Sequence, residues 1–401
     1  MSKIYIVAAK RTAVGKFGGS LSSLSAADIA THVIKNILEE TKVDPSNIDE
    51  VVVGNILSAG QKQGVARQAS INAGIPKEVP AYGLNMICGS GMKTIMSAYT
   101  SIKAGEANLV LAGGTETMSG ASFLLPASIR DGVKMGDMKV VDSMILDGLT
   151  DAFSNLHMGI TAENIAEQYN ISREEQDAFA IRSQEYAAKA IDEGKFKDEI
   201  VPVEIVKRRE TFVFDTDEYV NRTTNIEKLG KLRPAFKKDG SVTAGNASGI
   251  NDGAAFVLVA SEEALKKYNL TPMVEIVAVG QGGVDPSIMG MGPVPAIAQA
   301  LKKANMKLSD MDLLELNEAF AAQSIGVMKQ LSEDHGVTAD WFEKKCNVNG
   351  GAIAIGHPIG ASGNRITVSL IYEMKRRNSQ FGLASLCIGG GMGTAVILKN
   401  V

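Results

Sequence analysis

Two cysteines and one histidine of this chain stand beside glycines, at positions where their side chains could do covalent chemistry. The first cysteine, Cys88, lies in the segment Asn85–Gly91, between an apolar run and a helix-forming stretch. A cysteine at such a strand-to-helix elbow meets the helix N-terminus, which lowers the pKa of the thiol, and a backbone N–H that can bind an oxyanion. The same segment also fits a glycine turn in which Cys88 only fills space, so this motif alone leaves both interpretations open.

The histidine and the second cysteine have similar surroundings. His357 stands between a glycine and a proline in the segment Asn349–Gly363, where the backbone cannot continue a helix and another group can approach closely. This setting favours a general base over a core histidine. Cys387 ends a predicted strand and is followed by the glycines of Gly389–Gly391, which expose backbone N–H groups. A tight turn between paired strands explains the glycines equally well.

A fourth segment, Asn317-Glu318-Ala319-Phe320, follows the predicted strand Asp312–Leu316. An amide at the carboxyl end of a strand is well placed to hold a water or an oxyanion, and it can also cap the following helix. All four segments lie where a strand ends and a glycine turn or a helix begins. We therefore expect them to meet at one edge of the sheets.

The elements that position these residues alternate between apolar strands and amphipathic helices, which is typical of an α/β protein. The first strand is expected at Ile4–Ala9, and a helix at Ala27–Glu40 with Ser25 as its cap and His32 on its solvated face. Further strands are expected at Val51–Leu57, Asn108–Gly113, Phe256–Ala260, Val274–Val279, Leu383–Ile388 and Ala395–Leu398.

The middle of the chain has a different character. Ser119–Gly159 shows no sustained periodicity, and a charged helix follows that opens with the capping box Ser172-x-x-Glu175 and closes near Gly194. The stretch Lys207–Lys238 then carries a local excess of basic residues. These features fit poorly inside a regular sheet, and we predict that residues 119–249 form an inserted lobe.

The two ends of the chain resemble each other in order and type of segment. Ile48–Asn55 parallels Met311–Glu318, and Gly89-Ser90-Gly91 parallels Ala361-Ser362-Gly363, each triplet preceding a predicted helix. Leu109–Met118 likewise parallels the run 383–392, and the second copy has extra residues near Gln330–Lys345. The sequence predicts a duplicated α/β unit, with an N-terminal half made of 1–118 and 250–271 and a C-terminal half made of 272–401.

The composition excludes several classes of function. A net charge of −4 over 401 residues gives no footprint for nucleic acid or an anionic membrane, although local Lys and Arg residues can still bind an anionic substrate. Three cysteines do not make a disulfide framework, and the chain contains no apolar run of membrane-spanning length. The first apolar run is too short for a signal peptide, so a cytoplasmic location is expected.

Taken together, the four segments Asn85–Gly91, Asn317–Phe320, Asn349–Gly363 and Cys387–Gly393 resemble the thiolase family, over essentially the whole chain. The segments Leu149–Gly159 and Gly245–Gly253 are similar to its short-chain, biosynthetic branch. The resemblance implies a five-layered αβαβα fold and a homotetramer built as a dimer of dimers. It also implies the reversible condensation of two acetyl-CoA molecules to acetoacetyl-CoA, with no metal and no cofactor beyond CoA as substrate and product.

The resemblance also implies a role for each site residue. Cys88 would carry the acetyl group with His357 as its base, and Cys387 would take the proton from the second acetyl-CoA. His357 and a water held by Asn317 would bind the enolate oxygen, and the N–H groups of Cys88 and Gly389 would bind the tetrahedral intermediate. For the substrate, it implies Ser248 and Ala247 at the pantetheine arm, His157, Met158 and Leu149 at the acyl end, Met289, Ala319 and Phe320 along the pocket, and Arg222 near the nucleotide.

Other interpretations remain open at this point. A β-ketoacyl synthase shares the duplicated fold, but Cys387 in its glycine-rich context argues against that enzyme class. A non-catalytic lipid-binding relative, a degradative thiolase for longer 3-ketoacyl-CoAs and a zinc site of Cys88, His357 and Cys387 are further possibilities. The two site cysteines are also expected to lie near enough to form a disulfide on oxidation, whereas Cys346 is expected to be structural.

Overall fold

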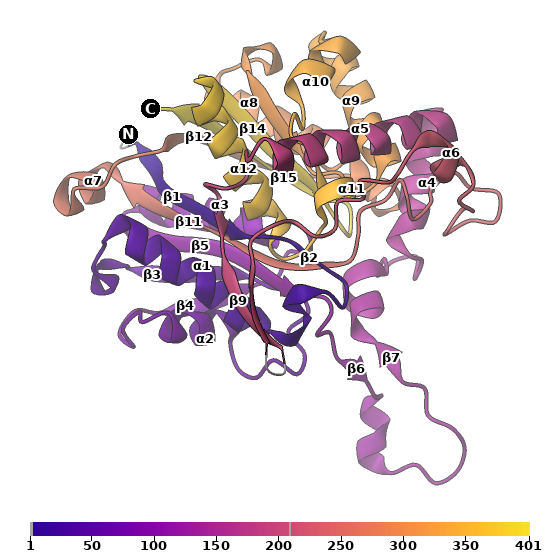
Figure 1. Ribbon diagram of the computed structural model, residues 1–401, viewed down its shortest axis with the longest axis horizontal. Coiled ribbons are helices and arrows are strands. Elements are labelled where there is room, and N and C mark those ends of the chain that lie inside the picture. Colours follow the sequence, from indigo (N-terminus) through magenta and orange to yellow (C-terminus); the bar gives the residue numbers. More distant parts are fainter. Residues whose placement is uncertain (1–2, 208–209) are drawn as a thin grey trace.

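The computed structural model, which describes residues 3–207 and 210–401, is built around one large mixed sheet (Figure 1). The N-terminal half contributes β1 (Ile4–Thr12), β3 (Glu50–Gly54), β4 (Ala81–Leu84), β5 (Leu109–Thr117) and β11 (Asn251–Ser261), with the short β2 (Gly15–Lys16) beside β11. The C-terminal half contributes β12 (Val274–Gly283), β13 (Leu313–Leu316), β14 (Phe381–Ile388) and β15 (Met392–Asn400).

The order of the strands confirms the predicted duplication. The path β13-β14-β15-β12 mirrors the path β3-β5-β11-β1, and in each half one parallel pair is followed by antiparallel strands. The halves are joined where β1 pairs with β12, through the residue pairs Tyr5–Glu275 and Ile6–Val274. Such a short join lets the two halves form separate layers of one continuous sheet.

Helices cover both halves and also fill the space between them, as the expected five-layered αβαβα arrangement requires. The inner layer consists of α3 (Ser90–Ala104) and α12 (Ser362–Arg377), which contact each other and strands of both halves. One outer layer contains α1 (Ala26–Thr41) and α2 (Val65–Asn72), and the other contains α8 (Pro293–Ala304) and α9 (Ala321–His335). Three apolar cores separate these layers, one on each outer face and one around the inner helices.

The inner helices approach each other through glycines. A Cβ atom on Gly363 of α12 would lie 2.3 Å from the backbone nitrogen of Met92 in α3, and one on Gly91 would lie 3.0 Å from the backbone of Asn364. No real side chain tolerates the first of these separations. The repeated glycine triplets of the sequence therefore set the distance between the two central helices.

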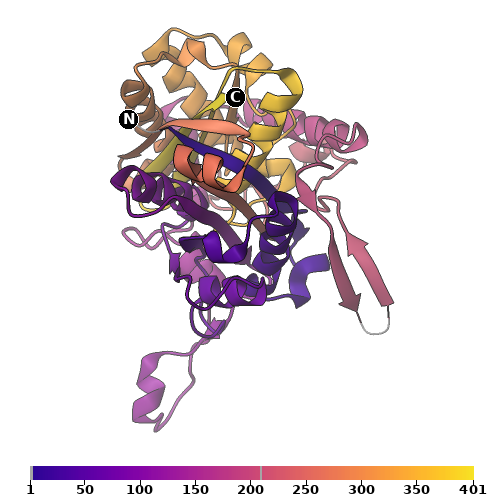
Figure 2. The same ribbon diagram turned by 90° about the vertical axis from the view of Figure 1, so that its left-hand side faces the viewer.

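Residues 119–249 supply much less of the sheet than the rest of the chain. An arm with strands β6 (Phe123–Leu124) and β7 (Val141–Asp142) stands off the body (Figures 1 and 2). The helices α4 (Met158–Gln168), α5 (Arg173–Asp192) and α6 (Ile226–Gly230) follow, and β8 (Ile200–Val201) pairs with β1. Strands β9 (Val203–Lys207) and β10 (Glu210–Phe214) pair with each other and project from the body (Figure 2).

Several local predictions are confirmed and others need correction. The capping boxes at Ser25 and Ser172 are both present. His32 is half-buried and not solvated, and burial together with Lys35 lowers its pKa. Part of the predicted basic stretch, Arg208 and Arg209, lies outside the described residues.

Strand β3 ends at Gly54 and not at Leu57, because a buried carboxylate competes for the backbone of the next residues. The backbone N–H groups of Ile56 and Leu57 donate to the side chain of Glu116, at 3.2 and 3.1 Å, and so turn the chain away from the sheet. The remaining short helices are α7 (Glu262–Tyr268), α10 (Ala339–Lys345) and α11 (Ala352–Ile355). In the described part of the chain, no helix is long and apolar enough to cross a membrane.

Candidate active site

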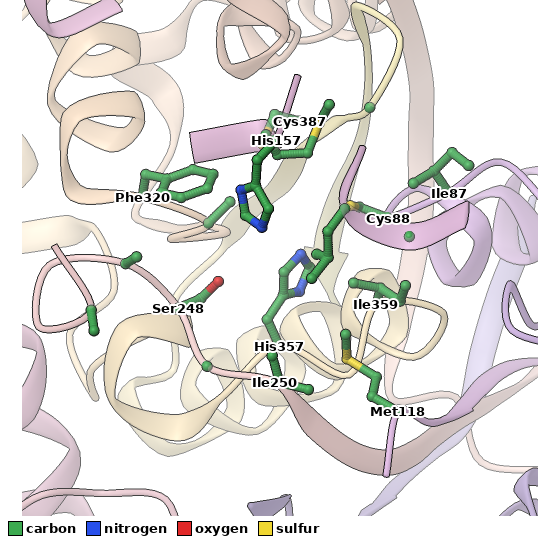
Figure 3. Close-up of a pocket in the computed structure, with 18 of the residues that line it drawn as sticks. Ile87, Cys88, Met118, His157, Ser248, Ile250, Phe320, His357, Ile359 and Cys387 are labelled. Atoms are coloured by element: carbon green, nitrogen blue, oxygen red, sulfur yellow. The ribbon is translucent and has the colours of Figure 1, made fainter. Parts of the chain in front are cut away.

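A cavity of about 430 Å³ lies where the predicted segments meet, between the two halves and the inserted lobe. All of the predicted site residues except Asn317 and Arg222 line it. Figure 3 shows the rings of His157 and His357 projecting into the space between Cys88 and Ser248. The lining is mostly apolar, which is typical of a pocket that holds an extended organic substrate and excludes water.

Cys88 sits on a strained elbow that two polar side chains hold in place. The preceding residue, Ile87, has a φ of 47°, a conformation that costs a β-branched residue about 1–3 kcal/mol. The side-chain oxygen of Asn85 accepts a hydrogen bond from the Ile87 N–H at 3.0 Å. The hydroxyl of Ser90 donates to the Ile87 carbonyl at 2.7 Å and accepts from Met86 N–H at 2.9 Å. These contacts fix the direction in which the Cys88 thiol points.

The protonation of Cys88 differs from the expectation. Burial raises the pKa of the Cys88 thiol to about 11, although the backbone N–H groups of Gly389 and of Cys88 itself act in the opposite direction. The predicted lowering by the helix N-terminus is therefore wrong for the free protein, because loss of hydration outweighs the local donors. The contact with Gly389 N–H nevertheless places a backbone donor beside the Cys88 sulfur.

His357 is fixed by two hydrogen bonds, and the one to its ring selects its tautomer. Its backbone N–H donates to the Asn251 side chain at 2.9 Å, and its Nδ1 lies 2.6 Å from the hydroxyl of Ser362. That hydroxyl donates its single hydrogen to the carbonyl of Pro358 at 2.9 Å. It can then only accept from Nδ1–H, which leaves Nε2 without a proton and free to act as the base.

His357 is also kept neutral. Burial lowers the pKa of His357 to about 3, and the positive charge of Arg365 contributes in the same direction. At neutral pH the imidazole therefore carries no charge and is available to accept a proton during the reaction.

Cys387 is the penultimate residue of β14 and is almost completely buried beside Gly393 of the paired strand β15. Gly390 and Gly391 have φ values of 83° and 84°, so the turn between the strands requires glycine. The glycines therefore form a tight turn, and Cys387 also places its thiol at the cavity, so the two interpretations of this motif are both correct. Burial, with a smaller contribution from the charge of Cys88, raises the pKa of Cys387 far above its usual range.

His157 caps α4 and presents a hydrogen-bond donor to the cavity. Its Nδ1 accepts a hydrogen bond from the Gly159 N–H at 3.0 Å, and burial lowers its pKa. The neutral ring therefore carries its hydrogen on Nε2. The ring of Phe236 stacks on it with 4.6 Å between centroids and an angle of 19° between planes, and holds it in position.

The loop around Ser248 is tied to the segment that follows β13. The Ser248 N–H donates to the Ala319 carbonyl at 3.0 Å, and Ala247 forms an isolated bridge with Phe320. Phe320 in turn meets the edge of Phe236 at 6.2 Å between centroids. These contacts join the predicted pantetheine loop and the predicted acyl pocket into one wall.

Two predicted residues lie outside the lining of the cavity. Asn317 is buried behind it, where its backbone N–H donates to the Ser385 carbonyl at 3.0 Å. The alternative role of Asn317 as a helix cap is wrong, because α9 begins at Ala321 and its N-cap is Phe320. Arg222 is exposed and forms a paired contact with Asp192, at 2.8 and 2.9 Å, so its predicted place near a nucleotide stays a prediction.

Several lining residues were not predicted. Phe236 lies in the basic stretch, outside every motif, and the signal that could have marked its partner is Gly159, where a Cβ would lie 2.2 Å from the ring. Phe17, Met118 and Tyr219 also lie outside the motifs, whereas Ile250 and Ile359 lie within Gly245–Gly253 and Asn349–Gly363 but were assigned no role. The structure offers no support for a zinc site, since the described residues include no cluster of three or more His, Cys, Asp or Glu side chains suited to a metal ion.

Comparison with known proteins agrees with this geometry. Residues 4–263 match the model of the thiolase N-terminal domain, and residues 270–400 match that of the thiolase C-terminal domain. The chain belongs to the thiolase family. The two matched regions together span almost the entire chain.

Similar proteins are alike over their whole length. The acetyl-CoA acetyltransferase of Allochromatium vinosum is 53% identical over 399 residues, covering 99% of each chain. The crystal structure of the Bacillus anthracis acetyl-CoA acetyltransferase has a TM-score of 0.95 and 44% identity, covering 100% of this chain and 99% of that one. Human mitochondrial 3-ketoacyl-CoA thiolase in complex with CoA has a TM-score of 0.93 and 46% identity, covering 100% of this chain and 98% of that one.

Proposed function

We propose that this thiolase is an acetyl-CoA C-acetyltransferase, which condenses two acetyl-CoA molecules reversibly to acetoacetyl-CoA and CoA. The observation that carries the proposal is the meeting of Cys88, Cys387 and a neutral His357 around one apolar cavity, with the Gly389 N–H at the Cys88 sulfur. A nucleophilic thiol, a second thiol and an imidazole are the groups that thioester exchange and carbon–carbon bond formation require. The reaction needs no cofactor other than CoA itself.

The first step transfers an acetyl group to Cys88. Because both thiols have raised pKa values and His357 is neutral, the resting site holds Cys88–SH, Cys387–SH and an unprotonated Nε2. His357 takes the proton of Cys88 as its sulfur attacks the acetyl carbonyl, and the carbon–sulfur bond to CoA breaks. His357 then gives that proton to the departing CoA thiolate, so acetyl-Cys88, CoA–SH, a neutral His357 and the Cys387 thiol remain.

The second step makes the carbon–carbon bond. His357 takes the proton of the Cys387 thiol as the Cys387 sulfur removes a proton from the methyl group of a second acetyl-CoA, and the resulting enolate attacks the carbonyl carbon of acetyl-Cys88. The bond between that carbon and the Cys88 sulfur breaks, acetoacetyl-CoA forms, and His357 gives its proton to Cys88. Every group regains its initial state, which agrees with a site whose thiols are both protonated at rest. Donors that hold the enolate oxygen lower the barrier of this step.

A degradative activity on longer 3-ketoacyl-CoAs is the second candidate. It is favoured by the likeness to human mitochondrial 3-ketoacyl-CoA thiolase, which at 46% identity is about as similar as the solved acetyltransferase at 44%. Comparison of kcat/KM for acetoacetyl-CoA and for 3-ketoacyl-CoAs of six to ten carbons, at saturating CoA, separates the two. A steep fall with chain length supports the acetyltransferase, and a flat or rising series supports the second candidate.

We also propose a homotetramer of the dimer-of-dimers type, located in the cytoplasm. The arm between β6 and β7 exposes large apolar side chains, with Phe123 at 68%, Leu125 at 48% and Met135 at 95% exposed. Strand β4, with Tyr82 at 44% exposed, forms a free edge of the sheet. Free strand edges and projecting apolar arms are usually covered by another subunit. A dimer of dimers needs one interface within each dimer and a second between the dimers. The edge of β4 and the arm are distinct surfaces, so each can form one of them.

Replacement of the proposed nucleophile tests the function. We expect Cys88→Ser to lower kcat for CoA-dependent cleavage of acetoacetyl-CoA by at least about 10³-fold, because an alcohol is a far weaker nucleophile and leaving group than a thiol here. The intact mass of the wild type, but not of the variant, should increase by one acetyl group on incubation with acetyl-CoA. Cys346→Ala is the matched control, since Cys346 is buried outside the cavity lining. Full activity of Cys88→Ser overturns the proposal.

A further inference from the structure

Asn317 is held by a buried arginine from the central helix. Arg365 of α12 is only 1% exposed, and its Nη2 donates to the side-chain oxygen of Asn317 at 3.4 Å. The side-chain nitrogen of Asn317 is buried and has no hydrogen-bond partner in the protein. A guanidinium has only donors, so the amide oxygen must face it and the amide NH2 must face the other way. The orientation of Asn317 therefore follows from Arg365.

Regular geometry explains why Arg365 reaches this position. Glu315 and Asn317 stand two residues apart at the end of β13, so their side chains lie on the same face of the strand. Ser362 and Arg365 stand three residues apart on α12, so they lie on one face of that helix. One turn of α12 thus places Ser362 on His357 and Arg365 on Asn317, the two side chains that the proposed enolate site needs.

The positive charge of Arg365 is poorly compensated. Its nearest carboxylate is that of Glu315, with 3.8 Å between Nη1 and Oε2, which is too long for a hydrogen bond. Burial raises the pKa of Glu315 to about 8, so this carboxyl keeps its proton for most of the time at neutral pH. The Nε and Nη1 groups of Arg365 have no hydrogen-bond partner among the described residues. A buried cation without a hydrogen-bonded carboxylate therefore stands beside Asn317 and acts on His357 as well, while Asp217 and Glu199 contribute negative charge from farther away.

We propose that Arg365 is a positioning residue for carbon–carbon bond formation, which orients Asn317 as a hydrogen-bond donor and adds a positive field where the enolate oxygen develops. The proposal rests on the proposed function, because only a reaction through an enolate needs such a donor. It assigns Arg365 no part in the transfer of the acetyl group to Cys88. The two half-reactions should therefore respond differently to its removal.

The half-reactions can be measured separately. Incorporation of isotopically labelled CoA into acetyl-CoA requires acetyl-Cys88 and no enolate. Cleavage of acetoacetyl-CoA by CoA passes through the enolate of acetyl-CoA. We expect Arg365→Gln to lower kcat of cleavage by about 10- to 1000-fold, as the loss of an oriented oxyanion donor does, while label exchange changes by less than threefold. KM for acetoacetyl-CoA should stay within threefold, because Arg365 lies outside the cavity lining.

A double-mutant cycle decides whether Arg365 acts through Asn317. In an Asn317→Ala background, Arg365→Gln should have less than about a fifth of its effect on cleavage, because the amide that it orients is gone. Glu315→Gln is the matched control: it replaces the carboxyl next to Arg365 with an amide of the same size, keeps the contact with Asn317, and should leave cleavage within threefold. Arg365→Lys keeps the charge but not the planar donor pair, and we expect it to recover only part of the activity.

Each outcome has a definite meaning. Equal losses in exchange and cleavage, or the same effect of Arg365→Gln with and without Asn317, would mean that Arg365 only supports the fold, and would overturn the inference. If Arg365→Gln is recovered unfolded, the same comparison is made with Arg365→Lys, and an unchanged cleavage rate in that variant contradicts the directional role. A wild type without any label exchange would instead refute the proposed function, which makes the two failures distinguishable.

Discussion

At the scale of single residues, the site depends on which nitrogen of His357 is free to take a proton. Ser362 decides this, because its hydroxyl hydrogen is already donated to the Pro358 carbonyl. The imidazole must then donate from Nδ1, and Nε2 is presented to the cavity as an acceptor. Without Ser362 the two neutral tautomers become closer in energy, and only one of them can deprotonate Cys88.

We therefore predict that Ser362→Ala lowers kcat for acetoacetyl-CoA cleavage by about 10- to 100-fold with KM changed by less than threefold, because a wrong tautomer impairs the base and not the binding. Ser369→Ala is the control. Ser369 lies on the same helix, is also buried, and donates to Glu199 at 2.9 Å, away from the cavity. Both changes should lower the free energy of unfolding by about 1 kcal/mol. Equal activity of the two variants would argue against the tautomer role.

The sequence predicts the reacting groups better than the residues that control them. Cys88, His357 and Cys387 stand in glycine-rich motifs that have few structural explanations. Ser362 and Arg365 lie inside an ordinary-looking helix, and their roles depend on the tertiary contact between α12 and β13. The prediction of a lowered pKa for Cys88 was wrong for the same reason, because the effect of burial in the assembled site on this pKa is larger than that of the nearby helix N-terminus.

At the scale of elements, the distance between Cys88 and His357 depends on how closely α3 and α12 approach. Both side chains stand just before the N-termini of these helices. The contact is made by Gly91 and Gly363, where any Cβ meets the backbone of the other helix. A change in the distance between α3 and α12 at this contact therefore also changes the distance between Cys88 and His357.

Gly363→Ala should therefore lower the free energy of unfolding by about 1–3 kcal/mol and reduce kcat more than tenfold, because the extra carbon forces the helices apart. Thermal unfolding and steady-state kinetics measure the two effects. Gly230→Ala provides the comparison, since a Cβ there meets no atom within 4 Å and its stability should change by less than about 1 kcal/mol. Normal activity in a destabilised Gly363→Ala protein would show that the separation does not control catalysis.

The elements themselves were predictable where apolar periodicity is strong. Every strand expected from an apolar run is present, with ends that differ by a few residues. Strand β4 was missed because none of its residues is fully buried and its sequence, Ala81–Leu84, has no continuous apolar run. The short elements of the arm were missed because only two residues pair in each of its strands.

At the scale of the whole molecule, the arm reaches away from the body with an apolar surface that the chain itself does not cover (Figures 1 and 2). The large exposed side chains on it belong to Phe123, Leu125, Ile129, Val133, Met135, Met138 and Val140. Their number over so short a stretch exceeds what isolated surface residues explain. The free edge of β4 lies on the body itself, in a different part of the chain.

Replacement of residues 125–140 by a short Gly–Ser linker should therefore convert a tetramer into a dimer that keeps its β4 contact. Light scattering coupled to size-exclusion chromatography measures the mass, and acetoacetyl-CoA cleavage checks that the site is intact. We expect kcat to stay within about fivefold, since the arm residues removed do not line the cavity. A wild type that is already dimeric, or a variant that stays tetrameric, would refute the role of the arm.

The duplication has one more consequence, because equivalent positions in the two halves have different roles in the site. The counterpart of Cys88 in the second half, one position before the matching triplet, is Gly360. A side chain there would lie 2.6 Å from Oε2 of Glu116, which accepts the Gly360 N–H at 3.0 Å. One elbow thus carries the nucleophile, and the other has no room for a side chain and supports the loop that carries His357. The two similar halves contribute complementary parts of a single site, so neither half contains the whole set of reacting groups.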